Sequence, residues 1–183
     1  MAVKSHWMWI IIPASLMGVL AGCTASPAKD ADDIPAPVQV AGNEVLAQRA
    51  HAAGVQIYRC GPDKSDMTHF VWLLQGPEAD LLDHAGHKIG KHYAGPTWEA
   101  ADGSKVLGEV AARAPSPDPK AVAWLLLSAK STSGAGVFAK VRFIQRLHTV
   151  GGNPPADGCD QVSAGRDVRV PYSADYWFYV DKP

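Results

Sequence analysis

From Val55 to the C-terminus, short runs of β-forming residues alternate with Gly, Pro and Asp, and this pattern most strongly constrains the fold. The clearest turn signal is Asp102-Gly103, a dipeptide that favours a two-residue hairpin loop. Most of the runs follow one another at hairpin spacing, so we predict an all-β domain. Its architecture is a mainly antiparallel β-sandwich or barrel of about eight to ten strands. One short N-terminal helix is expected over residues 43–51, with Asn43 as its N-cap.

The expected strands are residues 55–60, 70–74, 80–83, 88–93, 97–101, 104–110, 122–129, 137–150, 168–170 and 176–180. The run 122–129 is apolar enough to be the central buried strand. In the run 137–150, side chains alternate with period two. We therefore expect Phe143 and Leu147 on the core face and Arg146 mostly on the other.

The N-terminus has the features of an export signal. Lys4 precedes an almost wholly apolar stretch, residues 7–20, that is short for a membrane span. The stretch ends in Leu-Ala-Gly-Cys23, which resembles the bacterial lipobox, whose cysteine is acylated and becomes the mature N-terminus. The alternative is an ordinary signal peptide that contains a cysteine. We predict a signal peptide over 1–22, an acylated Cys23 with a flexible tether over 23–40, and one β-rich domain over 41–183.

Charge and location constrain the partners. The formal net charge is −1, and removal of residues 1–22, with their single Lys4, gives −1 − 1 = −2. Such a chain has neither the basic surface of a nucleic-acid-binding protein nor a polybasic membrane patch. We expect a monomer held to the lipid bilayer through Cys23. Thr24 lacks the aspartate associated with inner-membrane retention, so we expect a cell-envelope protein on the outer membrane.

Cysteine usage agrees with export. If Cys23 is acylated, Cys60 and Cys159 form an even pair in an oxidising compartment, which favours a disulfide. The pair would close a loop of 159 − 60 = 99 residues. The chain-entropy model assigns such a loop about 4.7 kcal/mol of stabilisation. The alternative is two free thiols, although neither lies in a C-x-x-C motif.

Histidines supply the first candidate site. His84, His87 and His92 are spaced H-x2-H-x4-H, and imidazole is a common ligand of zinc and copper, so the three are candidate metal ligands. The alternative for His84 and His87 is a solvated turn, because a single metal needs all its ligands at about 2 Å.

His92, Trp98 and Asp102 are the candidate binding residues. His92 precedes Gly95-Pro96 and could act as a general base or contact a ligand; it could equally be a buried histidine that pins this turn. An aromatic side chain such as Trp98 could stack on a ligand or a sugar, or belong to the core.

Catalytic and cofactor motifs are sparse. The sequence contains no G-x-S-x-G or H-E-x-x-H motif. Residues 134–139 match the loose dinucleotide pattern G-x-G-x-x-A, but the residues that follow alternate as in a strand, so a hairpin turn explains them better. We expect no cofactor and predict no catalytic residue.

Several distinctive motifs follow one another along the chain: GVQIYRC (54–60), GKHYAGPTWE (90–99), IQRLHTVGG (144–152) and VPYSADY (170–176). Together they resemble the family catalogued as domain of unknown function 3455. The resemblance implies a secreted or surface single domain without an established activity, so no catalytic residues can be carried over. Its matched cysteines, Cys60 and Cys159, fit the expected disulfide.

These observations favour a non-enzymatic β-domain that binds a small molecule, a glycan or a protein partner. One alternative is a hydrolase-like enzyme that uses His92 and a carboxylate such as Asp102 near Trp98. The other is a metal-binding envelope protein that uses the hairpin from His84 to His92.

Overall fold

The computed structural model describes Met1 and residues 33–183. The predicted signal peptide, the lipobox with Cys23 and most of the predicted tether lie outside the described residues. Among those described, no helix is long and apolar enough to cross a membrane.

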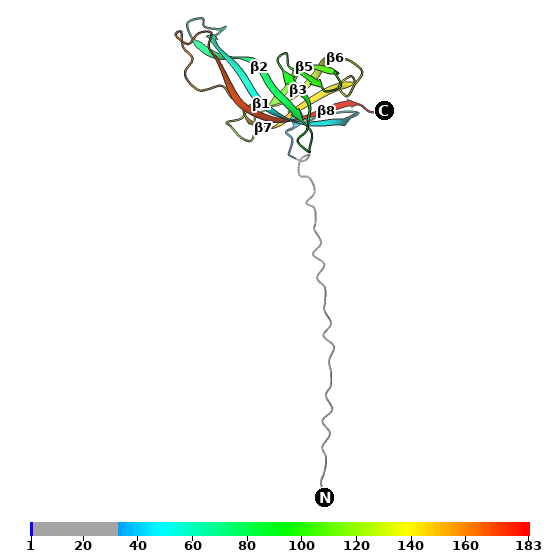
Figure 1. The fold of residues 1–183 in the computed structure, drawn as a ribbon. Coiled ribbons are helices and arrows are strands. Elements are labelled where there is room, and N and C mark those ends of the chain that lie inside the picture. Colours follow the sequence, from blue (N-terminus) through cyan, green and yellow to red (C-terminus); the bar gives the residue numbers. More distant parts are fainter. Residues whose placement is uncertain (2–32) are drawn as a thin grey trace. The chain divides into compact units, whose positions relative to one another are not determined.

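Within residues 33–183, eight antiparallel strands form a closed barrel in which each strand pairs with its sequence neighbours and the last pairs with the first (Figure 1). The strands are β1 (Glu44–Pro62), β2 (Phe70–Leu82), β3 (Lys88–Tyr93), β4 (Thr97–Ala100), β5 (Lys105–Ala114), β6 (Trp124–Ser133), β7 (Val141–Gly151) and β8 (Asp167–Asp181). The all-β antiparallel prediction is confirmed, and closure between β1 and β8 makes the domain a barrel.

Several predicted segments differ from the structure. The helix expected over residues 43–51 is wrong, because this segment is the first half of β1 and pairs with β8. Helix propensity is a weak local preference, and a long ladder of cross-strand pairs overrides it here. The helical turn observed near the N-terminus is a 3-10 turn, η1 (Ala36–Val38). Residues 70–74 and 80–83 join into the single strand β2, and residues 168–170 and 176–180 join into β8.

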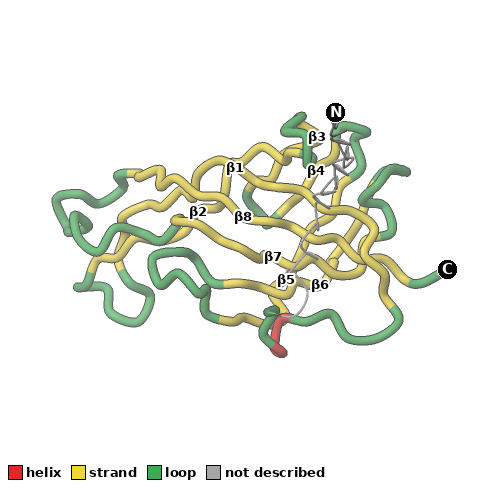
Figure 2. Tube along the Cα trace, turned by 90° about the horizontal axis from the view of Figure 1, so that it is seen from below, coloured by secondary structure: helices red, strands yellow, loops and turns green. Residues whose placement is uncertain are grey.

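The compact unit begins at Ile34, earlier than the boundary predicted at residue 41. Val38 is fully buried and packs with Ile34 against Trp124 and Trp177, which project outward from β6 and β8. Nε2 of Gln145 donates a hydrogen bond of 2.6 Å to the carbonyl oxygen of Val38. Residues 34–40, which we predicted as tether, therefore include a strap over the outer face of the barrel, seen beside β5 and β6 in Figure 2.

The barrel interior holds the larger of the two apolar clusters. It contains large aromatic side chains, among them Trp98, Tyr176 and Phe178, together with small ones such as Ala52 and Ala174. The centroid of the Trp98 ring lies 5.1 Å from that of Tyr176 and 6.2 Å from that of Phe178, in edge-to-face geometry. Such aromatic pairs add about 0.5–1.5 kcal/mol each beyond their buried area.

From Phe143 onward, strand β7 presents the opposite set of side chains from the one predicted. The pairing of β7 with β8 shifts register between Val141 and Phe143, and a one-residue shift moves the following side chains to the other face. Ile144 therefore points into the interior cluster, and Arg146 follows it on the same face. Leu147, expected in the core with Phe143, instead packs under the N-terminal strap.

Cys60 and Cys159 form a disulfide, as predicted, with their Cα atoms 5.4 Å apart. The bond ties β1 to the loop that precedes β8. Two backbone hydrogen bonds join the same segments, from the Cys60 amide to Arg166 and from the Gly165 amide to Cys60. The disulfide thus links two segments that are neighbours in the barrel but are separated by 99 residues in the sequence.

Candidate functional site

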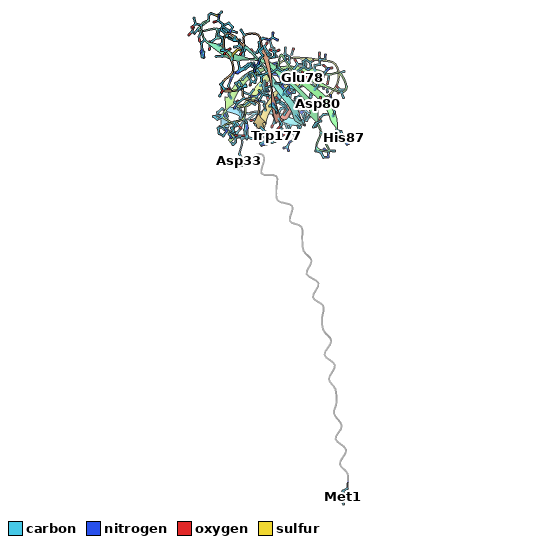
Figure 3. The ribbon with its side chains drawn as sticks, turned by 60° about the vertical axis from the view of Figure 1, so that its left-hand side comes forward. Met1, Asp33, Glu78, Asp80, His87 and Trp177 are labelled. Carbon is cyan, nitrogen blue, oxygen red and sulfur yellow. A yellow bond between two sulfur atoms is a disulfide. The ribbon has the colours of Figure 1, made fainter. Side chains whose placement is uncertain are left out.

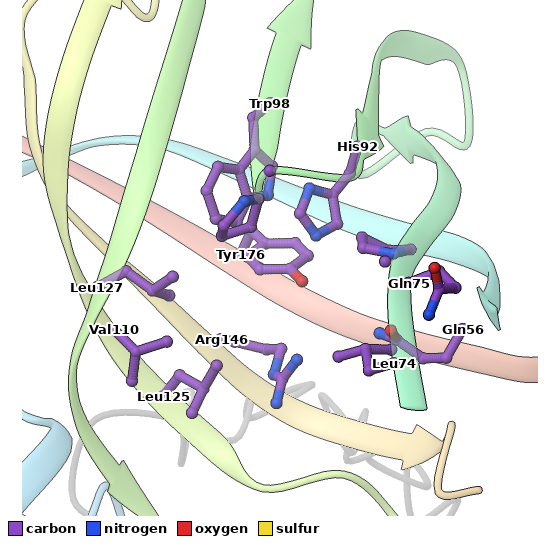
Figure 4. A pocket seen from close by; sticks show the side chains of 14 residues that line it. Gln56, Leu74, Gln75, His92, Trp98, Val110, Leu125, Leu127, Arg146 and Tyr176 are labelled. Carbon is purple, nitrogen blue, oxygen red and sulfur yellow. The ribbon is translucent and has the colours of Figure 1, made fainter. Parts of the chain in front are cut away.

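The barrel contains a cavity of about 260 Å³ that opens beside Leu74 and Val110 (Figure 4). Its apolar wall comes from β2, β5 and β6 and includes Leu74, Val110, Leu125 and Leu127. The side chains that bring polar groups to its lining are Gln56, Gln75, His92, Trp98, Arg146 and Tyr176. A mainly apolar hollow with a few polar groups has the composition of a small-molecule site.

His92 and Trp98 form the aromatic end of the cavity. They are direct cross-strand partners on β3 and β4, which the Gly95-Pro96 turn connects, so their side chains share one face. Their rings stack with centroids 4.4 Å apart and planes 9° from parallel. Gly108 allows this packing, because a Cβ there would lie 2.9 Å from Cζ3 of Trp98.

The imidazole of His92 is neutral and its tautomer is defined. Burial, the largest effect, lowers the pKa of His92 from 6.5 to about 3, and the positive charge of Arg146 acts in the same direction. Nδ1 lies 2.9 Å from the carbonyl oxygen of Thr97, which can only accept, so Nδ1 carries the proton. Nε2 therefore keeps its lone pair and is a hydrogen-bond acceptor.

Arg146 brings a cationic group to the cavity wall. Its Nε and Nη2 donate hydrogen bonds of 3.1 and 2.8 Å to the carbonyl oxygen of Ala123, which hold the guanidinium in place. Among the described residues, no carboxylate lies within 4.0 Å of it. Figure 4 shows the guanidinium between Leu125 and Leu74, on the side of the cavity away from Trp98.

Two buried polar atoms of the cavity wall have no hydrogen-bond partner among the described residues: Nε1 of Trp98 and Oε1 of Gln56. Trp98 and Gln56 are only 1% and 2% exposed. An unsatisfied buried polar group typically costs about 1–3 kcal/mol. One donor, Nε1 of Trp98, and one acceptor, Oε1 of Gln56, are thus left without a partner among the described residues. Both residues belong to a lining that also contains the cationic side chain of Arg146.

The structure brings two of the three candidate binding residues together and not the third. Asp102 lies at the turn between β4 and β5, where its carboxylate accepts hydrogen bonds from the amide of Ser104 at 2.8 Å and from the amide of Val137 at 2.8 Å. A hydrogen bond of 2.6 Å from the Ser104 hydroxyl has the largest effect in lowering the pKa of Asp102, and the two amide bonds lower it further. Asp102 therefore organises two loops, and the proposed pairing of His92 with Asp102 is wrong. No aspartate or glutamate from residues 33–183 lines the cavity.

The three candidate metal ligands do not converge. His84 and His87 are exposed at the turn between β2 and β3, where His87 projects from the domain (Figure 3). Nδ1 of His87 lies 3.3 Å from Oδ2 of Asp83 in the same turn. His92 instead points into the barrel, 3% exposed. Within the described part of the chain, no three His, Cys, Asp or Glu side chains are placed to hold a metal ion.

Four polar residues of the cavity lining were missed from the sequence: Gln56, Gln75, Arg146 and Tyr176. Gln56 and Tyr176 lie within the motifs 54–60 and 170–176, but neither residue type indicates chemistry alone. A signal for Arg146 was present, because it lies two residues after Ile144 in an alternating strand. The bulge near Val141 reverses the two faces of the strand after that point, so alternation in the sequence alone does not show which face is interior.

A family model described as protein of unknown function (DUF3455) matches residues 40–180, which contain every residue of the cavity lining. No curated protein and no solved structure matches the chain significantly. The match covers most of the sequence and agrees with the motifs that pointed to the same family. The chain therefore belongs to the DUF3455 family.

Proposed function

We propose that this domain is a non-enzymatic binding module that holds a small, mainly apolar molecule in its interior cavity. The observation that carries the proposal is the lining itself, in which apolar side chains surround a few polar groups that lack partners. A cavity lined only by apolar groups would need no ligand to satisfy it. Here the polar side chains of the lining, among them His92 and Arg146, would orient a ligand that carries polar groups of its own.

A small molecule is favoured over a glycan or a protein partner by where the aromatic residues lie. Trp98, Trp124 and Trp177 are buried, so they offer no exposed stacking platform for a sugar. Trp72 is partly exposed, but its Nε1 donates to the carbonyl oxygen of Asp157 and it lies outside the cavity. The large apolar side chains that are exposed include Leu74 and Val110, which both belong to the cavity mouth. Part of the exposed apolar surface of the barrel therefore leads into the cavity.

Binding can be tested by titrating the full chain with N-phenyl-1-naphthylamine, a neutral dye whose fluorescence rises in an apolar environment. The variant Val110→Trp places a large side chain at the cavity mouth and should weaken binding by about tenfold or more, since two lost methylene contacts already cost this much. Val45→Trp is the matched control. Val45 is 37% exposed against 38% for Val110, and it does not line the cavity.

The expected result is saturable binding to the natural sequence and to the Val45 variant, with loss in the Val110 variant. Equal binding by all three proteins would place the dye elsewhere and contradict the proposal. An absence of binding to the natural sequence, with the fold intact by circular dichroism, would also contradict it.

For location, we propose that acylated Cys23 anchors the domain to the outer membrane of a bacterial envelope. The proposal rests on the lipobox-like sequence before Cys23. Residues 24–33 would then span at most about 35 Å between the lipid and the strap. Mass spectrometry of the protein expressed in bacteria should show a diacylglyceryl group on an N-terminal Cys23, lost in Cys23→Ala. An unmodified mature N-terminus would refute the anchor.

A further inference from the structure

The ligand chemistry can be specified further, and this inference rests on the proposed function of the cavity. We propose that the cavity selects a small apolar monocarboxylate, whose carboxylate is bound by Arg146 while its apolar body lies against Trp98, Tyr176 and the leucine wall. The argument uses the charge of the lining, the donors that Arg146 leaves free, and the size of the cavity.

The cavity lining carries a single positive charge. Among the described residues that form it, Arg146 alone carries a charge at neutral pH, because His92 is held neutral by burial and no acidic side chain is present. The guanidinium is positive in proteins at any accessible pH. One fixed positive charge on an apolar wall favours a ligand with one negative charge, since a dianion would leave a second charge without compensation.

The geometry of Arg146 leaves donors for such a ligand. A guanidinium carries five N–H donors in a fixed plane, and the two bonds to Ala123 use one from Nε and one from Nη2. The N–H groups of Nη1 and the second N–H of Nη2 are not used by these bonds. Arg146 also approaches the hydroxyls of Tyr172 and Tyr176, and its charge and side-chain hydrogen bonding lower their pKa values, although burial, the largest effect, raises both. A ligand carboxylate would therefore share these donors with the two tyrosine hydroxyls. The planar fork matches the two oxygens of a carboxylate.

The size of the cavity limits the apolar part of the ligand. At about 260 Å³, the cavity exceeds the roughly 150 Å³ that accommodates benzene in an engineered protein core. A body of two fused rings is therefore a suitable probe. The side chains of His92, Trp98 and Gln56 also belong to the lining, where they add polar groups to a mainly apolar wall.

The test compares two probes of the same shape, 2-naphthoate and 2-naphthamide, by isothermal titration calorimetry with the full chain at neutral pH. The first carries a carboxylate and the second a neutral amide in its place. We expect naphthoate to bind at least about tenfold more tightly, as a charge-assisted hydrogen bond provides. In Arg146→Gln this preference should disappear, with naphthoate weakened by about tenfold to hundredfold and naphthamide changed by less than about threefold.

Two variants test whether the preference for naphthoate depends on Arg146 itself, rather than on the fold or on the net charge of the protein. Arg146→Lys keeps the positive charge and should retain part of the preference for naphthoate. Arg142→Gln removes the same charge from the same strand, but Arg142 is exposed and pairs with Asp181, so the preference should be unchanged.

The outcomes distinguish the two proposals. Equal affinity for the two naphthyl probes, or an unchanged preference in Arg146→Gln, would overturn the carboxylate assignment while leaving the cavity proposal in place. If neither naphthyl probe binds and neutral N-phenyl-1-naphthylamine does, the assignment is likewise overturned and the cavity stands. If none of the three binds, both proposals fail.

Discussion

Acidification should destabilise this domain through the single buried histidine of the cavity. In the folded protein, burial lowers the pKa of His92 from 6.5 to about 3. In the unfolded chain the imidazole is solvated and titrates near its ordinary pKa of about 6.5. Between these two values the unfolded state binds a proton that the folded state does not. A falling pH therefore favours unfolding.

The magnitude follows from the width of this window. Each pH unit below about 6.5 costs about 1.4 kcal/mol of folding free energy, until the folded histidine itself protonates near pH 3. From about pH 7.5 to about pH 5, His92 should therefore remove about 2 kcal/mol. Above about pH 7.5 its contribution is constant, since both states are then neutral. Carboxylates with lowered pKa values, such as Asp83 and Asp102, lose their stabilisation only at more acidic pH.

Urea unfolding followed by tryptophan fluorescence at the two pH values measures this effect. The reference is His92→Gln, whose amide can still donate to the Thr97 carbonyl oxygen but does not titrate. The natural sequence should lose about 2 kcal/mol more than the variant between about pH 7.5 and about pH 5. The variant's own lower stability cancels in this comparison. Parallel losses, equal to within about 0.5 kcal/mol, would show that His92 is not held neutral by burial and would refute the reasoning.

Three further perturbations test the packing of the barrel. Reduction of the Cys60–Cys159 bond should lower the free energy of unfolding by up to about 4.7 kcal/mol, measured in urea with and without dithiothreitol; an unchanged midpoint would contradict its structural role. Gly108→Ala would place a Cβ 2.9 Å from the cavity's indole ring, so we expect a loss of about 1–3 kcal/mol by chemical denaturation and weaker dye binding. Val38→Ala should cost about 1–3 kcal/mol because it opens the contact between strap and barrel, whereas Val162→Ala, at a 95% exposed position, should change little; similar losses in both would show that the strap is not packed.

The local features of this protein were readable from its sequence. The spacing of turn residues predicts antiparallel strands, and the Gly95-Pro96 turn brings His92 and Trp98 opposite each other because a short hairpin leaves few other registers. The pairing of Cys60 with Cys159 follows from counting cysteines, once Cys23 is set aside as the predicted acylation site. Each of these inferences depends on residues close in sequence or on a small number of possible pairs.

The cavity depends on contacts that no local pattern encodes. The pairing of β1 with β8 closes the sheet, turns residues 43–51 into strand, and separates an interior from an outer face that the strap then covers. The register shift near Val141 decides that Arg146 faces this interior, because a displacement of one residue exchanges the two faces of a strand. Local alternation shows only that a strand has two faces; long-range pairing determines which one encloses the cavity.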